Sequence, residues 1–185
     1  FLVVFPLWAI FIGRGGAIAY DKLREKFSPR VAVTVAACFL AGQAWGLVGT
    51  WPCFLSYYNL GLGGLRGADR LGMEIDYWGE AVTRDFLEQV VTSVPEGAHI
   101  DVSPVLLPQH IQTDEMLAQS PLLRRRGIVL SAYEPEAKTH AEYVIVFRRL
   151  ADLSPAVRDL TAQRPPVIAV RRNGVLLAGL WKTGK

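Results

Sequence analysis

The sequence predicts membrane α-helices, namely the end of one transmembrane helix and one full transmembrane helix, followed by a small mixed α/β extracytoplasmic domain. Residues 1–54 are mostly apolar, apart from a basic stretch at residues 14–30. After residue 80, segments with helical periodicity alternate with segments rich in β-formers. A segment rich in glycine and aromatic residues lies between these two regions. We therefore divide the chain into transmembrane helices at 1–54, a membrane-exit joint at 55–79 and an α/β domain at 80–185.

The excess of positive charge is concentrated near the N-terminus. Of 20 Lys and Arg and 17 Asp and Glu residues, five basic and two acidic ones lie in residues 1–53, and the rest of the chain carries 15 of each sign. The excess therefore indicates membrane topology, and we expect no nucleic-acid partner. The two cysteines, Cys38 and Cys53, lie in or beside the apolar region and predict apolar packing rather than a disulfide framework.

Residues 1–13 are apolar throughout but are too few to cross a bilayer, which takes about 20 residues. They predict the end of a transmembrane helix, with a buried helix of a soluble protein as the alternative. The chain begins inside this apolar run without an initiator Met or a charged leader. We therefore expect it to be the C-terminal part of a longer polypeptide.

The basic stretch at 14–30 leads to a second apolar segment. Ala19, Leu23 and Phe27 share a helical face, which predicts a short helix on the membrane surface, with an ordinary connecting loop as the alternative. Residues 31–54 contain no charge and are long enough to span a membrane.

Two features fix how this span is expected to end and which way it runs. Pro52 is expected either to end or to kink the helix. The positive-inside rule places residues 14–30 in the cytoplasm and everything after Phe54 outside, in the periplasm of a Gram-negative cell or its equivalent, so we expect the protein in the bacterial cytoplasmic (inner) membrane.

The α/β domain is predicted element by element. Val82, Phe86, Val90 and Val94 recur every four residues and predict an amphipathic helix over 79–94. Further predicted elements are strands at 99–102, 128–132 and 142–148, helices at 114–125 and 154–163, and a hairpin around Asn173-Gly174. These elements predict a two-layer or three-layer domain with about five strands.

The joint contains the most distinctive residues of the chain. Tyr57 and Tyr58 follow the predicted membrane exit, where a tyrosine ring lies among the headgroups while its hydroxyl stays hydrated. The pair Glu74 and Asp76 is suited to contact a sugar or a cation, but capping a helix that begins near Gly79 is the favoured interpretation. A linker that merely docks the soluble domain onto the bilayer is the plainer alternative for the joint as a whole.

The order of residues in the joint resembles the last transmembrane exit of bacterial GT-C-type integral membrane glycosyltransferases, of the dolichyl-phosphate-mannose–protein mannosyltransferase and aminoarabinose-transferase-like group. The resemblance covers about residues 52–79, and the sequence departs from it at Trp51, where the family often has His. The residues that carry it are Pro52, Leu55-Ser56-Tyr57-Tyr58-Asn59, Gly63-Gly64, Gly67-Ala68, Gly72 and Asp76-Tyr77-Trp78-Gly79, with the closing hairpin Arg172 to Leu177.

The resemblance implies an enzyme that moves a sugar from a polyprenyl-phosphate carrier to a glycan, lipid or protein acceptor outside the membrane. It also implies that the catalytic carboxylate, with a divalent cation nearby, lies in an earlier extracytoplasmic loop upstream of this chain. We therefore assign no catalytic residue, metal ligand or cofactor here. The candidate substrate-binding residues are Tyr57, Tyr58, Asn59, Asp76 and Trp78. The alternative function is a non-enzymatic membrane-anchored periplasmic domain that binds an envelope partner.

Three other sequence patterns give weaker indications of function. His99, His110 and His140 lack metal-ligand spacing. The basic run at 124–126 is suited to a lipid phosphate if it faces the bilayer, although favourable charge at a helix C-terminus is the preferred explanation. The glycine-rich segment 61–67 lacks the lysine and the preceding strand of a nucleotide-binding loop.

Overall fold

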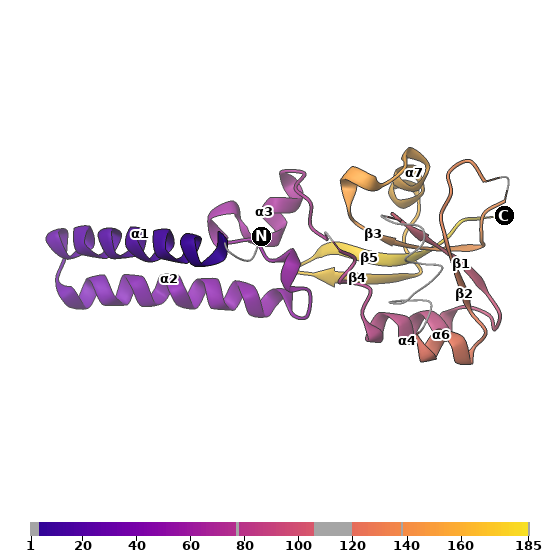
Figure 1. Cartoon of the computed structure of the whole chain (residues 1–185), viewed down its shortest axis with the longest axis horizontal. Helices are drawn as coiled ribbons and strands as arrows, with labels where there is room; N and C mark the ends of the chain where they lie inside the picture. The colour runs from indigo at the N-terminus through magenta and orange to yellow at the C-terminus, as the bar shows by residue number, and fades with distance from the viewer. Residues whose placement is uncertain (1–3, 77, 106–119, 138, 185) are drawn as a thin grey trace. The chain divides into compact units, whose positions relative to one another are not determined.

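The computed structural model describes residues 4–76, 78–105, 120–137 and 139–184. The chain forms two compact units, Phe1–Trp45 and Gly46–Lys185. The first unit holds a helical hairpin, and the second holds the joint and the α/β domain (Figure 1).

The first unit consists of two antiparallel helices. Phe27 and Ser28 alone join α1 (Val4–Lys26) to α2 (Pro29–Thr50), so the chain reverses direction within two residues (Figure 1). Pro29 occupies the first position of α2, where its missing N–H group costs no helical hydrogen bond.

The basic segment 14–30 differs from both sequence-based interpretations. It forms neither a separate surface helix nor a connecting loop, because α1 continues without a break to Lys26. Most residues between Ala17 and Lys26 are good helix formers. Arg24 and Lys26 lie in the last turn, where positive charge stabilises the negative end of the helix dipole.

α2 carries the apolar segment that was predicted to span a membrane. Among the described residues it is the one helix that is long and apolar enough to cross a bilayer. Its large side chains are exposed: Phe39 by 64%, Leu40 by 67% and Trp45 by 80%. A core helix of a soluble protein would bury such residues within its own fold, which α2 does not do among the described residues. α2 ends at Thr50, so Pro52 ends the helix rather than kinking it.

The second unit is built on a five-stranded mixed sheet. β1 is parallel to β2 and β3, whereas β5 is antiparallel to both of its neighbours, β3 and β4. Across the sheet the order is β2 (Val129–Ala132), β1 (His99–Ser103), β3 (Tyr143–Phe147), β5 (Val175–Lys182) and β4 (Ile168–Arg172).

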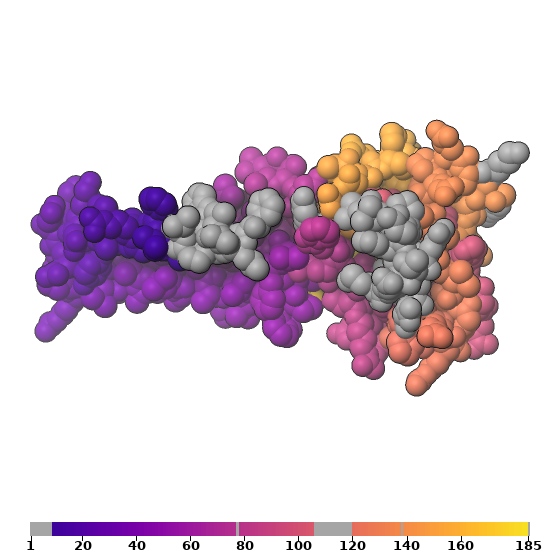
Figure 2. Space-filling model, viewed as in Figure 1, coloured from indigo at the N-terminus to yellow at the C-terminus, as the bar shows by residue number. Residues whose placement is uncertain are grey.

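Helices cover both faces of this sheet, which makes three layers (Figure 1). On one face, α4 (Arg84–Ser93) and α6 (Pro121–Arg125) pack side by side (Figure 2) and bury side chains such as Ile145 of β3. On the other face, α7 (Pro155–Gln163) packs against Val144, Val146 and Trp181. The alternation along β3 explains why this central strand is apolar on both sides.

Most predicted elements are confirmed. The three predicted strands and the hairpin form where expected, within about one residue, and Ser154 caps α7. Of the helix predicted at 114–125, the structure shows α6, and residues 114–119 lie outside the described part. The helix predicted to begin at Gly79 begins at Arg84, because Gly79 has a positive φ of 71° and Thr83 supplies the N-cap.

Candidate functional site

The joint contains three short helical elements, followed in the described residues from 71 on by turns and irregular structure. They are the 3₁₀ helices η1 (Phe54–Ser56) and η2 (Leu60–Leu62) and the helix α3 (Gly64–Arg70). The carboxylate of Glu80 binds η1. It accepts hydrogen bonds from the backbone N–H groups of Leu55 (3.0 Å) and Ser56 (2.8 Å) and from the Ser56 hydroxyl (3.1 Å). Ser56 is fully buried. Glu80 was not among the predicted site residues, and it joins the beginning of the joint to its end.

Asn59 organises the second element. Its side-chain oxygen accepts a hydrogen bond from the backbone N–H of Leu62 at 3.1 Å, so Asn59 is the N-cap of η2. Gly63 follows with a φ of 79°, a left-handed conformation that glycine adopts without strain. Gly67 then passes so close to the Leu62 carbonyl that a Cβ atom there would lie 1.7 Å from its oxygen. Gly63 and Gly67 of the joint therefore serve chain reversal and close backbone packing.

The predicted aromatic residues have different surroundings. Tyr58 is half-buried, packs against the hydrophobic core and donates a hydrogen bond to the backbone oxygen of Glu74. Tyr57 is half-buried, with its ring near Gly46 in the last turns of α2. Trp78 lies on the surface with 62% of its area exposed. Tyr77, which belongs to the resembling motif, lies outside the described residues.

The two carboxylates of the motif do not cap α4, contrary to the favoured interpretation. Glu74 instead accepts hydrogen bonds from the backbone N–H groups of Leu150 (2.7 Å) and Ala151 (2.6 Å), just after β3. Asp76 accepts one from the N–H of Glu80 at 3.1 Å. The reason for the difference is that α4 starts later than expected, at Arg84, and the Thr83 hydroxyl occupies its N-cap position.

Asp76 is the most perturbed acid of the joint. Its side chain is fully buried, and its Oδ2 atom accepts no hydrogen bond from the described residues. Burial, and next the nearby Glu80 charge, raise the pKa of Asp76 to about 6, although backbone N–H groups of residues 79–81 offset part of this rise. Cys53 is fully buried in the hydrophobic core, in agreement with its predicted packing role.

The β4–β5 hairpin meets the joint at the edge of the sheet. Arg172 donates a hydrogen bond through Nε to the backbone oxygen of Trp51 at 2.7 Å, and Arg66 of α3 donates one to the backbone oxygen of Asn173. Asp69 of α3 forms an ion pair with Arg148 at 2.9 Å, just after β3. The Asn-Gly turn was predictable, but no sequence signal indicated that it would reach the end of α2.

A pocket of about 260 Å³ opens where α3 meets this turn. The lining residues are Arg66, Asp69, Arg70, Gly174 and Val175. None of them was among the predicted substrate-binding residues, which contribute mainly to the internal structure of the joint. Sequence reasoning recorded the charges of α3 but could not place them beside the hairpin, about 100 residues further along the chain.

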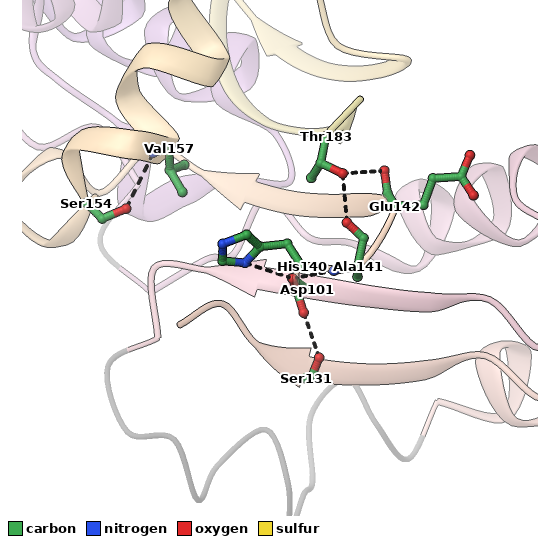
Figure 3. Close-up of polar contacts among 8 residues, drawn as sticks. All are labelled: Asp101, Ser131, His140, Ala141, Glu142, Ser154, Val157 and Thr183. Atoms are coloured by element: carbon green, nitrogen blue, oxygen red, sulfur yellow. Dashed lines mark hydrogen bonds and ion pairs between the residues drawn. The ribbon is translucent and has the colours of Figure 1, made fainter. Parts of the chain in front are cut away.

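A second polar cluster lies on the α7 side of the sheet, between β1 and β2 (Figure 3). The buried carboxylate of Asp101 accepts hydrogen bonds from the Ser131 hydroxyl (2.7 Å) and the Ala141 N–H (3.0 Å) and lies 3.8 Å from Nδ1 of His140. The His140 ring stacks on Tyr133, with ring centroids 4.6 Å apart. This cluster fastens the connection between β2 and β3. The signal for it was an acidic residue between two apolar ones in a predicted strand.

The remaining histidines and the basic run do not assemble a site. His99 and His140 lie in separate segments, and His110 is outside the described residues. In the described part of the chain, no three His, Cys, Asp or Glu side chains are arranged to hold a metal ion. Arg124 and Arg125 lie in the last turn of α6, in agreement with the preferred explanation of helix-dipole stabilisation.

Comparison of the chain with protein-family models, with curated proteins and with solved structures gives no match.

The raised pKa of Asp76 predicts that the protein is less stable at neutral than at acidic pH. A buried acid whose pKa rises from 3.8 to about 6 is favoured in its protonated form, so stability falls as the pH rises from about 4 through 6. The expected loss is up to about 3 kcal/mol at pH 7. Replacement of Asp76 by Asn keeps the acceptor for Glu80 and should remove most of this dependence.

The measurement is the thermal unfolding midpoint of the full chain in detergent at pH 4.5 and 7.5, followed by circular dichroism. The control is Asp159→Asn, at an exposed position of α7, which should leave the dependence as it is in the unmodified chain. An Asp76→Asn variant with the same pH dependence as the unmodified chain would contradict the assignment.

Gly67→Ala should destabilise the joint. The new methyl group would collide with the backbone oxygen of Leu62, and relief requires η2 and α3 to separate, at a cost of about 1–3 kcal/mol. We expect a lower unfolding midpoint and faster proteolysis within residues 59–72. Gly16→Ala is the matched control, because nothing lies within 4 Å of a Cβ there, and it should be neutral or slightly stabilising. Equal stability of the two variants would show that the close approach at Gly67 is not required.

Proposed function

We propose that this chain is the C-terminal portion of a membrane glycosyltransferase that transfers a sugar from a polyprenyl-phosphate carrier to an extracytoplasmic acceptor. The observation that carries the proposal is the ordered series of motif residues from Pro52 to Gly79, which begins two residues after an apolar helix of membrane-spanning length. The basic segment 14–30 supports a cytoplasmic position for the turn between α1 and α2. The α/β domain then lies outside the inner membrane.

In this proposal the joint positions the α/β domain and contains no catalytic group. Hydrogen bonds within the joint engage Tyr58, Asn59 and Asp76. In this proposal these residues therefore affect the substrate only by maintaining the shape of the joint. The acid that deprotonates the acceptor, and the divalent cation beside it, belong to an earlier extracytoplasmic loop, as the resemblance implies. The α/β domain shapes the acceptor side or steadies the catalytic loops.

A second function is favoured by the same hydrogen bonds. Because Asn59, Glu74 and Glu80 are used to build the joint, the motif also suits a non-enzymatic, membrane-anchored periplasmic domain that binds an envelope partner. The two proposals differ in the protein that contains the chain. The enzyme requires further transmembrane helices and an Asp or Glu in an early outside loop, whereas a short parent with few helices supports the binding domain.

The direct test reconstitutes the full-length protein in proteoliposomes with a pool of polyprenyl-phosphate-linked radiolabelled sugars and an envelope extract as acceptor. The expected result is transfer of label to an acceptor, and its loss when the early-loop acid is replaced by its amide. If the full-length protein transfers no sugar from any donor in the pool, the enzyme proposal is wrong.

Single substitutions in the joint should lower the rate of sugar transfer without abolishing it. Tyr58→Phe removes the hydrogen bond to Glu74, worth about 1 kcal/mol, and should reduce the rate several-fold while the amount of membrane-inserted protein stays the same. Tyr57→Phe and Asn59→Ala extend the series. The control is Tyr143→Phe in β3. If all three joint variants transfer sugar at the unmodified rate, the joint is a structural linker only.

A further inference from the structure

Two arginines, Arg66 and Arg70, line the pocket between α3 and the β4–β5 turn. Nε of Arg66 donates to the backbone oxygen of Asn173, but its two Nη atoms have no acceptor among the described residues. Among the same described residues, the Arg70 guanidinium has no carboxylate or carbonyl partner. The acid of the pocket, Asp69, is already paired with Arg148 at 2.9 Å. The pocket therefore presents two guanidinium groups to an anion from outside.

The backbone of the turn makes room for the Arg66 guanidinium. Gly174 has a φ of 81°, and a Cβ atom there would lie 3.1 Å from an Nη atom of Arg66. The guanidinium consequently lies directly against the turn. A volume of about 260 Å³ is below the roughly 300–1,000 Å³ of pockets for drug-sized ligands, so the size suits a single charged group better than a glycan.

The pocket lies beside the residues at which the apolar helix ends. The turn that forms its wall lies close to Gly49 of α2: a Cβ atom added at Gly49 would lie 3.0 Å from Oδ1 of Asn173. Arg172, just before the turn, is hydrogen-bonded to Trp51. If α2 spans the bilayer, its last residues lie at the level of the lipid headgroups, and so does the pocket.

The chain segment that leads into α3 and just past it exposes large apolar side chains. Six large apolar side chains of residues 51–71 are exposed by 40–67%: Trp51, Phe54, Leu55, Leu60, Leu62 and Leu71. A short segment that combines exposed Trp and Leu side chains with arginines is typical of a surface that lies in the membrane interface. Water is a poor environment for such a surface, whereas the boundary between headgroups and acyl chains suits both kinds of side chain.

We propose that Arg66 and Arg70 bind the phosphate of an anionic phospholipid headgroup and that the exposed apolar residues of 51–71 enter the adjoining acyl layer. Two guanidinium groups match the oxygens of a phosphate, and each basic residue near an anionic leaflet contributes about 1 kcal/mol to the attraction. This inference does not depend on the enzyme proposal, because a non-enzymatic anchored domain would use the same contact.

The test measures lipid binding to the full chain, delipidated in a mild detergent, by native mass spectrometry during titration with phosphatidylglycerol. The expected result is one tight site on the unmodified chain, bound about tenfold more weakly after Arg70→Gln. Arg70→Lys keeps the charge and should retain most of the affinity. Arg70 is the residue to change because, unlike Arg66, it makes no contact on which the turn depends.

The control variant Arg124→Gln/Arg125→Gln removes the basic residues at the end of α6 and should bind phosphatidylglycerol as tightly as the unmodified chain. Circular dichroism confirms that each variant is folded. Equal affinity in Arg70→Gln, or an equal loss in the α6 variant, would overturn the assignment of the site. Binding of phosphatidylcholine as tightly as phosphatidylglycerol would exclude selection for anionic lipid, and equally tight binding of inorganic phosphate would identify a free-anion site instead.

Discussion

The carboxylate of Glu80 is the interaction on which the arrangement of the joint depends. It accepts three hydrogen bonds from Leu55 and Ser56, which lie about 25 residues earlier in the sequence, and so closes the joint into a loop. Ser56 is fully buried, so without Glu80 its backbone N–H would lose its partner in a place that water does not reach. The same carboxylate adds negative charge beside Asp76 and contributes to the raised pKa of that acid. Closure of the loop therefore increases the cost of keeping Asp76 ionised.

The closed loop attaches to the sheet through hydrogen bonds to backbone groups as well as through a shared hydrophobic core. Glu74 binds the N–H groups that follow β3, and Arg172 binds a carbonyl at the end of α2. β3 and β4 end, and β5 begins, at this edge of the sheet, so these strand ends lie near one another. Charged side chains that satisfy backbone groups fix position and direction more narrowly than apolar contacts do. The course of the chain from Thr50 into the α/β domain is consequently specified at several points.

The α/β elements were predictable because each depends on local patterning. The alternation in β1, the N-cap Ser154 and the Asn-Gly turn are all visible in the sequence, and the structure confirms them. The start of α4 was missed, because the four-residue repeat extended into a segment that Gly79 and Thr83 exclude from the helix. The partners of Glu74 and Arg66 were not predictable, since they lie about 76 and 107 residues away and nothing in a single sequence records such contacts.

This difference between local and distant contacts also bears on what the resembling motif does. Its polar residues Asn59 and Asp76 form hydrogen bonds within the joint, whereas the two arginines that line the pocket belong to α3, where the motif contains only glycine and alanine. A sequence pattern that specifies a backbone path is therefore compatible with many ligands, and in our proposal the residues beside the pattern select the ligand. Arg66 and Arg70 occupy such positions. The path set by the glycines of α3 brings both arginines to the hairpin turn, and the fold thereby concentrates positive charge beside the residues at which the apolar helix ends.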